Sequence, residues 1–172
     1  MNFGLLRVLN DDTVAPGMGF GTHPHENMEI ISIPISGDLR HRDSMGNEKT
    51  IKEGEIQVMS AGSGVTHSEF NPNKEKEVKF LQIWVIPNER DVTPRYDQQQ
   101  LPDFDQKNVL HQVLSPSADD AGVWIHQNAW FHMGRFDVSE VAHYQWKSEK
   151  NGLYAFVLEG RFEFGEHQLD QR

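Results

Sequence analysis

The sequence predicts an all-β protein built as a sandwich or a barrel. Over residues 1–90, short apolar runs with a two-residue period are separated by Gly, Asn and Asp turns. These runs recur at the regular spacing that sandwiches and barrels show. A length of 172 residues, with 10 Phe among them, is enough to bury a real core. We therefore expect one domain, or one domain and part of another.

The expected strands follow from the alternation of apolar residues and from the turn residues that end each run. Residues 28–35 place Ile31 and Ile33 on one face and end at a turn through Gly37. Almost continuous apolar residues over 78–86 predict a strand that is buried on both faces. The other expected strands are 55–60, 123–125, 130–136, 153–158 and 161–164.

The charge and the absence of cysteine exclude several classes of function. There are 16 Lys and Arg against 26 Asp and Glu, a formal charge of −10, which argues against nucleic acid as a direct partner. With 0 Cys, there are no disulfides, thiolate metal sites or cysteine nucleophiles. Residues 1–12 have one Arg and a brief apolar stretch, unlike a signal peptide. We expect a cytoplasmic protein that does not bind membranes.

Two pairs of potential metal ligands stand out from the sequence. His23 and His25 are two residues apart, so in an extended chain their side chains share one face. Pro24 favours an extended conformation for His23 and stiffens this pair. His67 and Glu69 form a second pair with the same spacing. If the two strands lie opposite each other in a barrel, three imidazoles and one carboxylate converge on one point.

The spacing alone leaves two interpretations open. An isolated histidine is more often a surface or hydrogen-bonded residue than a ligand, whereas two pairs in one β unit favour a metal site. The remaining histidines form no further same-face pair, so we expect no second metal site; they are His41, His111, His126, His132, His143 and His167.

The motifs around these pairs resemble a known family. GMGFGTHPHENMEIISIPISG (residues 17–37) resembles the first cupin motif, with one extra residue before its last Gly. Residues 54–71 resemble the second motif, although Ser60 replaces the usual Pro and two residues are added before His67. Within the cupins, the runs GFGTHPHENMEIIS, HRDSMGN, MSAGSGVTHSEFNP, FLQIWVIPN and PRY are similar to the pirin family.

The resemblance implies a fold and a set of ligands. Pirins are bicupins, so residues 1–90 are expected to form an N-terminal cupin β-barrel (a double-stranded β-helix). Residues 91–120 are then a connector, and residues 121–172 an incomplete C-terminal cupin barrel. The pirin pattern implies His23, His25, His67 and Glu69 as metal ligands. In the wider superfamily the Glu of the first motif is often the fourth ligand. An even number of residues separates Glu29 from His23 and His25, which would place it on their face, so Glu29 stays an alternative ligand or a pocket residue.

The implied metal is a divalent ion, with Fe(II) first and Ni, Mn, Cu or Zn as alternatives. Compared with the family, the chain is shorter at both ends, so the first barrel is expected to lack a strand and the second to be open. Open strand edges favour pairing with another chain. We therefore expect dimerisation or strand exchange to cover the second unit.

The resemblance also implies the function. The first hypothesis is an iron-dependent oxidoreductase of the quercetin 2,3-dioxygenase type, acting on a flavonol-like substrate and O2, in which Glu69 also accepts the substrate proton. The alternative is a metal- or redox-sensing regulator that binds a transcription factor or a metabolic enzyme without turnover. A third possibility is a cupin remnant without function.

Overall fold

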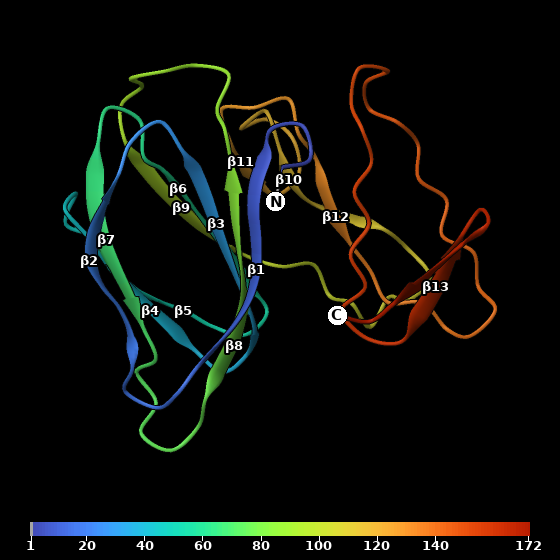
Figure 1. The fold of residues 1–172 in the computed structure, drawn as a ribbon, viewed down its shortest axis with the longest axis horizontal. Coiled ribbons are helices and arrows are strands. Elements are labelled where there is room, and N and C mark those ends of the chain that lie inside the picture. Colours follow the sequence, from blue (N-terminus) through green and yellow to red (C-terminus); the bar gives the residue numbers. More distant parts are fainter. Residues whose placement is uncertain (1) are drawn as a thin grey trace.

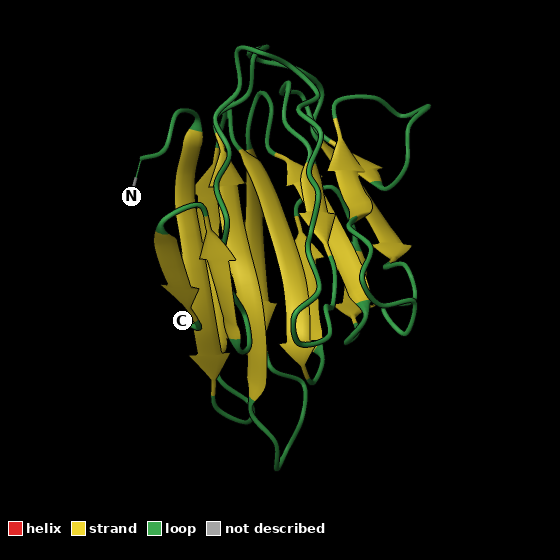
Figure 2. Ribbon diagram, turned by 90° about the vertical axis from the view of Figure 1, so that its right-hand side faces the viewer, coloured by secondary structure: helices red, strands yellow, loops and turns green. Residues whose placement is uncertain are grey.

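The computed structural model describes residues 2–172, and every regular element in that range is a β-strand (Figure 2). The prediction of an all-β fold is confirmed. The strands are β1 (Leu6–Val14), β2 (Gly19–His25), β3 (Glu29–Ser36), β4 (Leu39–Asp43), β5 (Glu48–Ile51), β6 (Glu55–Ser60), β7 (Val65–Phe70), β8 (Val78–Val85), β9 (Arg95–Gln100), β10 (His111–Ser115), β11 (Val123–Trp124), β12 (Phe131–Met133), β13 (Arg161–Phe164) and β14 (His167–Asp170). Within residues 2–172, no helix has the length and apolar character needed to cross a membrane.

The N-terminal half forms the expected barrel from two sheets (Figure 1). One sheet has five strands in the order β1-β8-β3-β6-β9, and the other has four in the order β2-β7-β4-β5. Their facing sides are joined by a fully buried apolar cluster to which both sheets contribute: Val14, Leu39, Ile51, Val78 and Phe80. The barrel interior is therefore a packed core at one end, and the histidine pairs lie on strands of the smaller sheet.

The two faces of the five-stranded sheet have different partners. On β3, Ile30 packs inside the barrel with Met59 and Val65. Its neighbour Ile31 points to the opposite face, where it joins a buried cluster with residues of the C-terminal half such as Leu114. This alternation follows from the pleat of the strand, and it explains why β3 is apolar on both faces.

The C-terminal half covers that outer face with fewer paired strands. It contains the three-stranded sheet β11-β10-β12 and the separate hairpin β13-β14. The prediction of a strand at 153–158 is wrong, because this segment has no ladder partner among residues 2–172. Its apolar side chains still pack against the main core through Phe156 and Leu158. Alternation alone indicates a buried face, but a strand also requires a neighbouring strand to pair with.

The segment 91–120, expected to connect the two units, contains two strands. β9 pairs with β6 and completes the five-stranded sheet on one side. β10 is the central strand of the C-terminal sheet. The segment thus supplies one strand to each half and joins them through a short stretch between Leu101 and Leu110.

Candidate metal centre

Three imidazoles converge where β2 lies against β7. The strands pair antiparallel, with His23 opposite His67 and His25 opposite Val65. The ring centroids are 4.8 Å apart for His23 and His25, 4.5 Å for His23 and His67, and 4.9 Å for His25 and His67. One ring nitrogen from each of the three lies within 4.8 Å of the others. The structure therefore brings these three predicted ligands to one point.

Close contact between the two strands sets this geometry. A Cβ on Gly19 would lie 2.3 Å from the carbonyl oxygen of Glu69 and 2.4 Å from the Cα of Phe70. Only glycine lets β2 approach β7 this closely. The ladder is irregular between Phe20 and His23, and the same-face pair at His23 follows directly after that irregularity.

The imidazole rings of His23, His25 and His67 have nitrogen lone pairs that are available to bind a metal ion. Burial, together with the neighbouring His23 and His25, lowers the pKa of His67 to about 3. Burial also lowers the pKa of His25 to about 4, with His23 contributing. The Nδ1 of His23 lies 2.7 Å from the carbonyl oxygen of Gly21, which can only accept, so Nδ1 carries the proton and Nε2 the lone pair. Neutral imidazoles of this kind are metal ligands.

Unpaired ring nitrogens show that the residues fit a metal ion. The Nε2 of His25 and the Nδ1 of His67 are buried and have no hydrogen-bond partner. The Nε2 atoms of His23 and His67 are 3.0 Å apart, a separation typical of two ligands on one ion. A buried polar atom without a partner costs about 1–3 kcal/mol, and coordination of an ion would remove that cost.

Glu69 shares the inner face of β7 with His67, as predicted, but it lies deeper in the barrel. It is fully buried and accepts hydrogen bonds from Ser32 Oγ at 2.8 Å and from the side-chain amide of Gln82. Burial raises the pKa of Glu69 to about 7, although both hydrogen bonds act in the opposite direction. Glu69 falls outside the group formed by His23, His25 and His67, and it groups instead with His67 and His41.

Glu29 does not reach the predicted centre. It lies on β3 in the other sheet, on the face of Ile31 that is turned away from the barrel interior. There it is 1% exposed and accepts a hydrogen bond from Ser60 Oγ at 2.7 Å. The expectation that Glu29 shares the face of His23 and His25 is wrong, because a bend at Asn27, with φ of 48°, separates the two strands. Because the turn interrupts the strand, the alternation of side chains between the two faces does not continue from His25 to Glu29.

His41 is the residue that the sequence reasoning missed. It is 0% exposed, and its ring centroid lies 5.4 Å from that of His67. The sequence predicts no ligand role for His41, because no other histidine lies two residues away. The pattern that indicates such a role is His-x-Asp. Asp43 follows His41 by two residues on the same strand face, and its carboxylate bonds the Nε2 of His41 at 3.0 Å.

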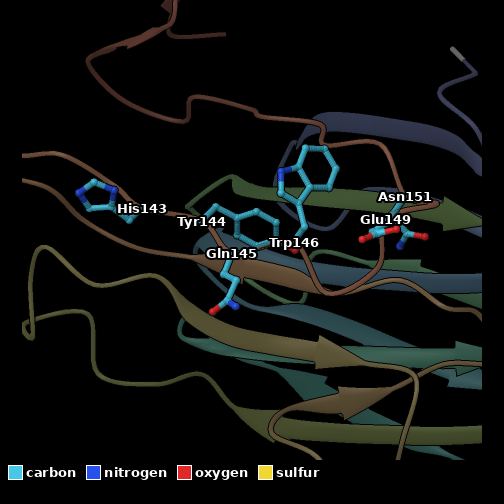
Figure 3. Close-up of a pocket in the computed structure, with 6 residues that line it drawn as sticks. All are labelled: His143, Tyr144, Gln145, Trp146, Glu149 and Asn151. Carbon is cyan, nitrogen blue, oxygen red and sulfur yellow. The ribbon is translucent and has the colours of Figure 1, made fainter.

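An open pocket lies elsewhere, on the C-terminal segment (Figure 3). It has a volume of about 900 Å³ and is lined by His143, Tyr144, Gln145, Trp146, Glu149 and Asn151. The predicted ligands do not line it. The rings of Tyr144 and Trp146 are 6.4 Å apart at an angle of 71°, and Trp146 is 52% exposed. This surface belongs to the half of the chain that lacks the histidine pairs.

Comparison with known families agrees with the geometry. The Pirin family model matches residues 2–85, and the model of the quercetinase C-terminal cupin domain matches residues 112–172. A relative from Zymomonas mobilis is 35% identical over 161 residues, which cover 93% of this chain and 68% of that protein. The chain belongs to the pirin family. The resemblance read from the sequence motifs is confirmed.

Further relatives of this pirin are known in sequence and structure. Quercetin 2,3-dioxygenase from Escherichia coli (strain K12) is 46% identical over 128 residues, which cover 74% of this chain and 54% of that protein. The crystal structure of YhhW from Escherichia coli superposes with a TM-score of 0.71 at 45% identity, covering 77% of this chain and 55% of the other. A structure of bacterial pirin YhhW in complex with nickel(II) gives a TM-score of 0.69 at 44% identity, over 74% of this chain and 54% of that one. The chain spans about half the length of the curated relatives it matches.

Proposed function

We propose that the N-terminal barrel of this pirin binds one divalent metal ion through His23, His25, His67 and Glu69. The observation that carries the proposal is the convergence of three imidazoles, with one ring nitrogen of each within 4.8 Å of the others. Glu69 stands two residues from His67 on the same strand face and would supply the carboxylate. Four such ligands on an octahedral ion leave positions open for a substrate.

The choice of metal rests on the donor set. Three imidazoles and one carboxylate suit Fe(II), Mn(II), Ni(II) or Cu(II) better than a closed structural zinc site. We propose Fe(II) as the physiological ion. The nickel(II) complex of the related YhhW supports a divalent ion in this kind of barrel.

We further propose that the complete enzyme is a metal-dependent dioxygenase of the quercetin 2,3-dioxygenase type, acting on a flavonol-like substrate and O2. The name of the Escherichia coli relative, which is 46% identical, supports this activity. When bound, the metal would act as a Lewis acid and hold the substrate beside oxygen. A cytoplasmic location is proposed on the composition of the chain.

Residues of the chain itself would handle the substrate proton. Glu69 has a pKa raised to about 7, close to the working pH that a general base requires. Ser32 Oγ donates to one of its oxygens at 2.8 Å, and the amide of Gln82 donates to the other, so the carboxyl group has a fixed orientation. Its burial excludes water from the point of proton transfer.

The proposed domain division follows the same outline. Residues 1–90 would form the cupin barrel that carries the centre, residues 91–120 the connecting segment, and residues 121–172 an incomplete second cupin barrel without a metal. β9 lies in the connecting segment and pairs with β6 of the first unit.

The experiment is turnover of quercetin by the iron-loaded full chain, followed by loss of flavonol absorbance and by oxygen uptake. We expect turnover in the wild type and in His143→Ala, a control on the exposed C-terminal segment. We expect loss of at least about 100-fold in His23→Ala and in His67→Ala, since each removes a ligand. Equal turnover in all four proteins would contradict the proposal.

A further inference from the structure

A second group of potential ligands lies deeper in the barrel, behind the three converging imidazoles. One ligand atom from each of His41, His67 and Glu69 lies within 4.8 Å of the others. All three residues are at most 1% exposed. His41 lies directly opposite Glu69 in the pairing of β4 with β7, so the backbone ladder holds these two residues side by side. The group shares His67 with the outer imidazoles.

Asp43 sets the orientation of His41. Its carboxylate accepts hydrogen bonds from the backbone N–H of Met45 at 2.9 Å and of Asn47 at 3.0 Å, and from the side-chain amide of Asn47 at 2.8 Å. A carboxylate with these donors is held as an acceptor, so the Nε2–H of His41 donates the 3.0 Å hydrogen bond to Asp43 and the ring proton stays on Nε2. The lone pair of His41 is therefore on Nδ1.

That Nδ1 atom has the features of a ligand atom without its ion. It is buried and has no hydrogen-bond partner, and the Nδ1 of His67 is in the same state. The ring of Tyr96 packs against His41 with centroids 4.9 Å apart and closes its other side. A carboxylate behind a histidine that presents its other nitrogen is the arrangement found at protein metal sites.

We propose that the centre has an inner metal position, held by His41, His67 and Glu69, in addition to the outer position formed by His23, His25 and His67 with Glu69 as its carboxylate. The inference rests on the proposed metal-binding function and deepens it. His67 belongs to both groups, so one ion occupies one position or the other.

The two positions offer different donors, and this decides which ion each prefers. The outer position has three imidazole nitrogens to one carboxylate oxygen, and this excess of nitrogen suits Ni(II) and Cu(II). The inner position has only two imidazole nitrogens to that oxygen, which shifts the preference toward Mn(II). His41 is then the residue that lets the barrel hold a harder ion, and it determines metal selectivity.

The test is a titration of the metal-free full chain with Mn(II) and with Ni(II) by calorimetry. We expect His41→Ala to weaken Mn(II) binding by at least about tenfold and to change Ni(II) binding by less than about twofold. We expect His25→Ala, in the outer group, to give the reverse pattern. Far-ultraviolet circular dichroism and thermal unfolding establish that each variant is folded.

Asp43→Asn provides a second variant that keeps the size of the side chain. An amide would donate to Nε2 of His41 and move the ring proton to Nδ1, so the ligand lone pair is lost without a cavity. We expect the same selective loss of Mn(II) binding as in His41→Ala.

The outcomes separate this inference from the proposed function. His67→Ala is expected to lose both metals, and retention of both would contradict the metal centre itself. If His67→Ala loses both, but His41→Ala and Asp43→Asn weaken neither metal or weaken both equally, the inner position is wrong and the outer centre stands.

Discussion

The two halves of the chain differ in how their strands are paired. In the N-terminal barrel, nine strands form two sheets, and the pairing of β2 with β7 places His23 directly opposite His67. In the C-terminal half, residues 134–160 contain no strand and run extended over the outside of the molecule (Figure 1). Val157 is the one buried apolar side chain beyond Ile125 in residues 2–172.

The paired strands of the N-terminal barrel are the part of the molecule that can hold a metal centre. Ligand atoms must be held to within about 0.5 Å, and only paired strands with packed side chains give that precision. The C-terminal half is held to the barrel by side chains such as Phe156 and Leu158, while Val138 is 96% exposed. The backbone that carries the C-terminal histidines is therefore held less rigidly than the paired strands that carry His23 and His67. Four experiments test this difference between the two halves.

The largest effect is expected from one substitution made in each half. Phe80 is 0% exposed inside the barrel, whereas Phe164 on β13 is 56% exposed. Phe80→Ala should lower the free energy of unfolding by about 3–5 kcal/mol, because it leaves a cavity among packed side chains. Phe164→Ala should change it by less than about 0.5 kcal/mol. Urea unfolding measures both, and equal losses would contradict the comparison.

Two glycines of β2 test how closely the barrel strands must approach. A Cβ at Gly19 would meet the backbone of Glu69 at 2.3 Å, while a Cβ at Gly21 would meet nothing within 4 Å. We expect Gly19→Ala to lower the free energy of unfolding by about 1–3 kcal/mol and to weaken Ni(II) binding, because β2 must move away from β7. Gly21→Ala is the matched control and should do neither. A similar effect of both changes on Ni(II) affinity would mean that the approach of the strands does not set the site.

The pH dependence of stability distinguishes a buried carboxyl group from an exposed one. Burial raises the pKa of Glu29 above its ordinary 4.5, and the bond from Ser60 and the Arg95 charge only partly oppose this. Between pH 4.5 and the raised value, the unfolded chain has released the proton and the folded chain keeps it, so stability falls as the pH rises. The slope is at most about 1.4 kcal/mol per pH unit for one proton.

The measurement is the free energy of unfolding of the wild type against that of Glu29→Gln from pH 4 upward. The wild type should lose stability relative to the variant as the pH rises. Glu163→Gln, at an exposed position on β13, is the matched control and should change the free energy of unfolding by less than about 0.5 kcal/mol. A difference between wild type and Glu29→Gln that stays constant with pH would show that Glu29 is not held in its protonated form.

The smallest effect is expected at the C-terminal hairpin. Arg161 and Asp170 form an ion pair at 2.7 Å, but their side chains are 65% and 60% exposed. Arg161→Ala should lower the free energy of unfolding by less than about 0.5 kcal/mol, and salt at about 1 M should remove the difference. A loss above about 1 kcal/mol that persists in salt would mean that the hairpin is held more tightly than its exposure indicates.

The sequence predicts β3, β6 and β8 well, since each has an alternating or continuous apolar run and a turn after it, but it does not single out polar strands such as β4, β5 and β9. It also places His23, His25 and His67 correctly on inner faces, because parity within one strand is a local property. It fails for Glu29, where the turn at Asn27 resets the parity. It fails for the segment 153–158 as well, because the presence of a pairing strand is not a local property.

His41 shows a different limit. Its partner on its own strand is Asp43, and its approach to His67 and Glu69 depends on the register of β4 against β7. The residues that neighbour His41 in the sequence do not determine that register. A His-x-Asp pair on a predicted strand is nevertheless a signal that can be sought beside His-x-His and His-x-Glu.

The most direct test of the metal centre is the metal content of the purified full chain after loading with Fe(II) under anaerobic conditions and desalting. Elemental analysis should find about one ion per chain in the wild type and in His143→Ala, and none in His67→Ala, whose ring belongs to both ligand groups. Iron retained by His67→Ala, or lost to the same extent in His143→Ala, would contradict the assignment of the centre to the paired strands of the N-terminal barrel.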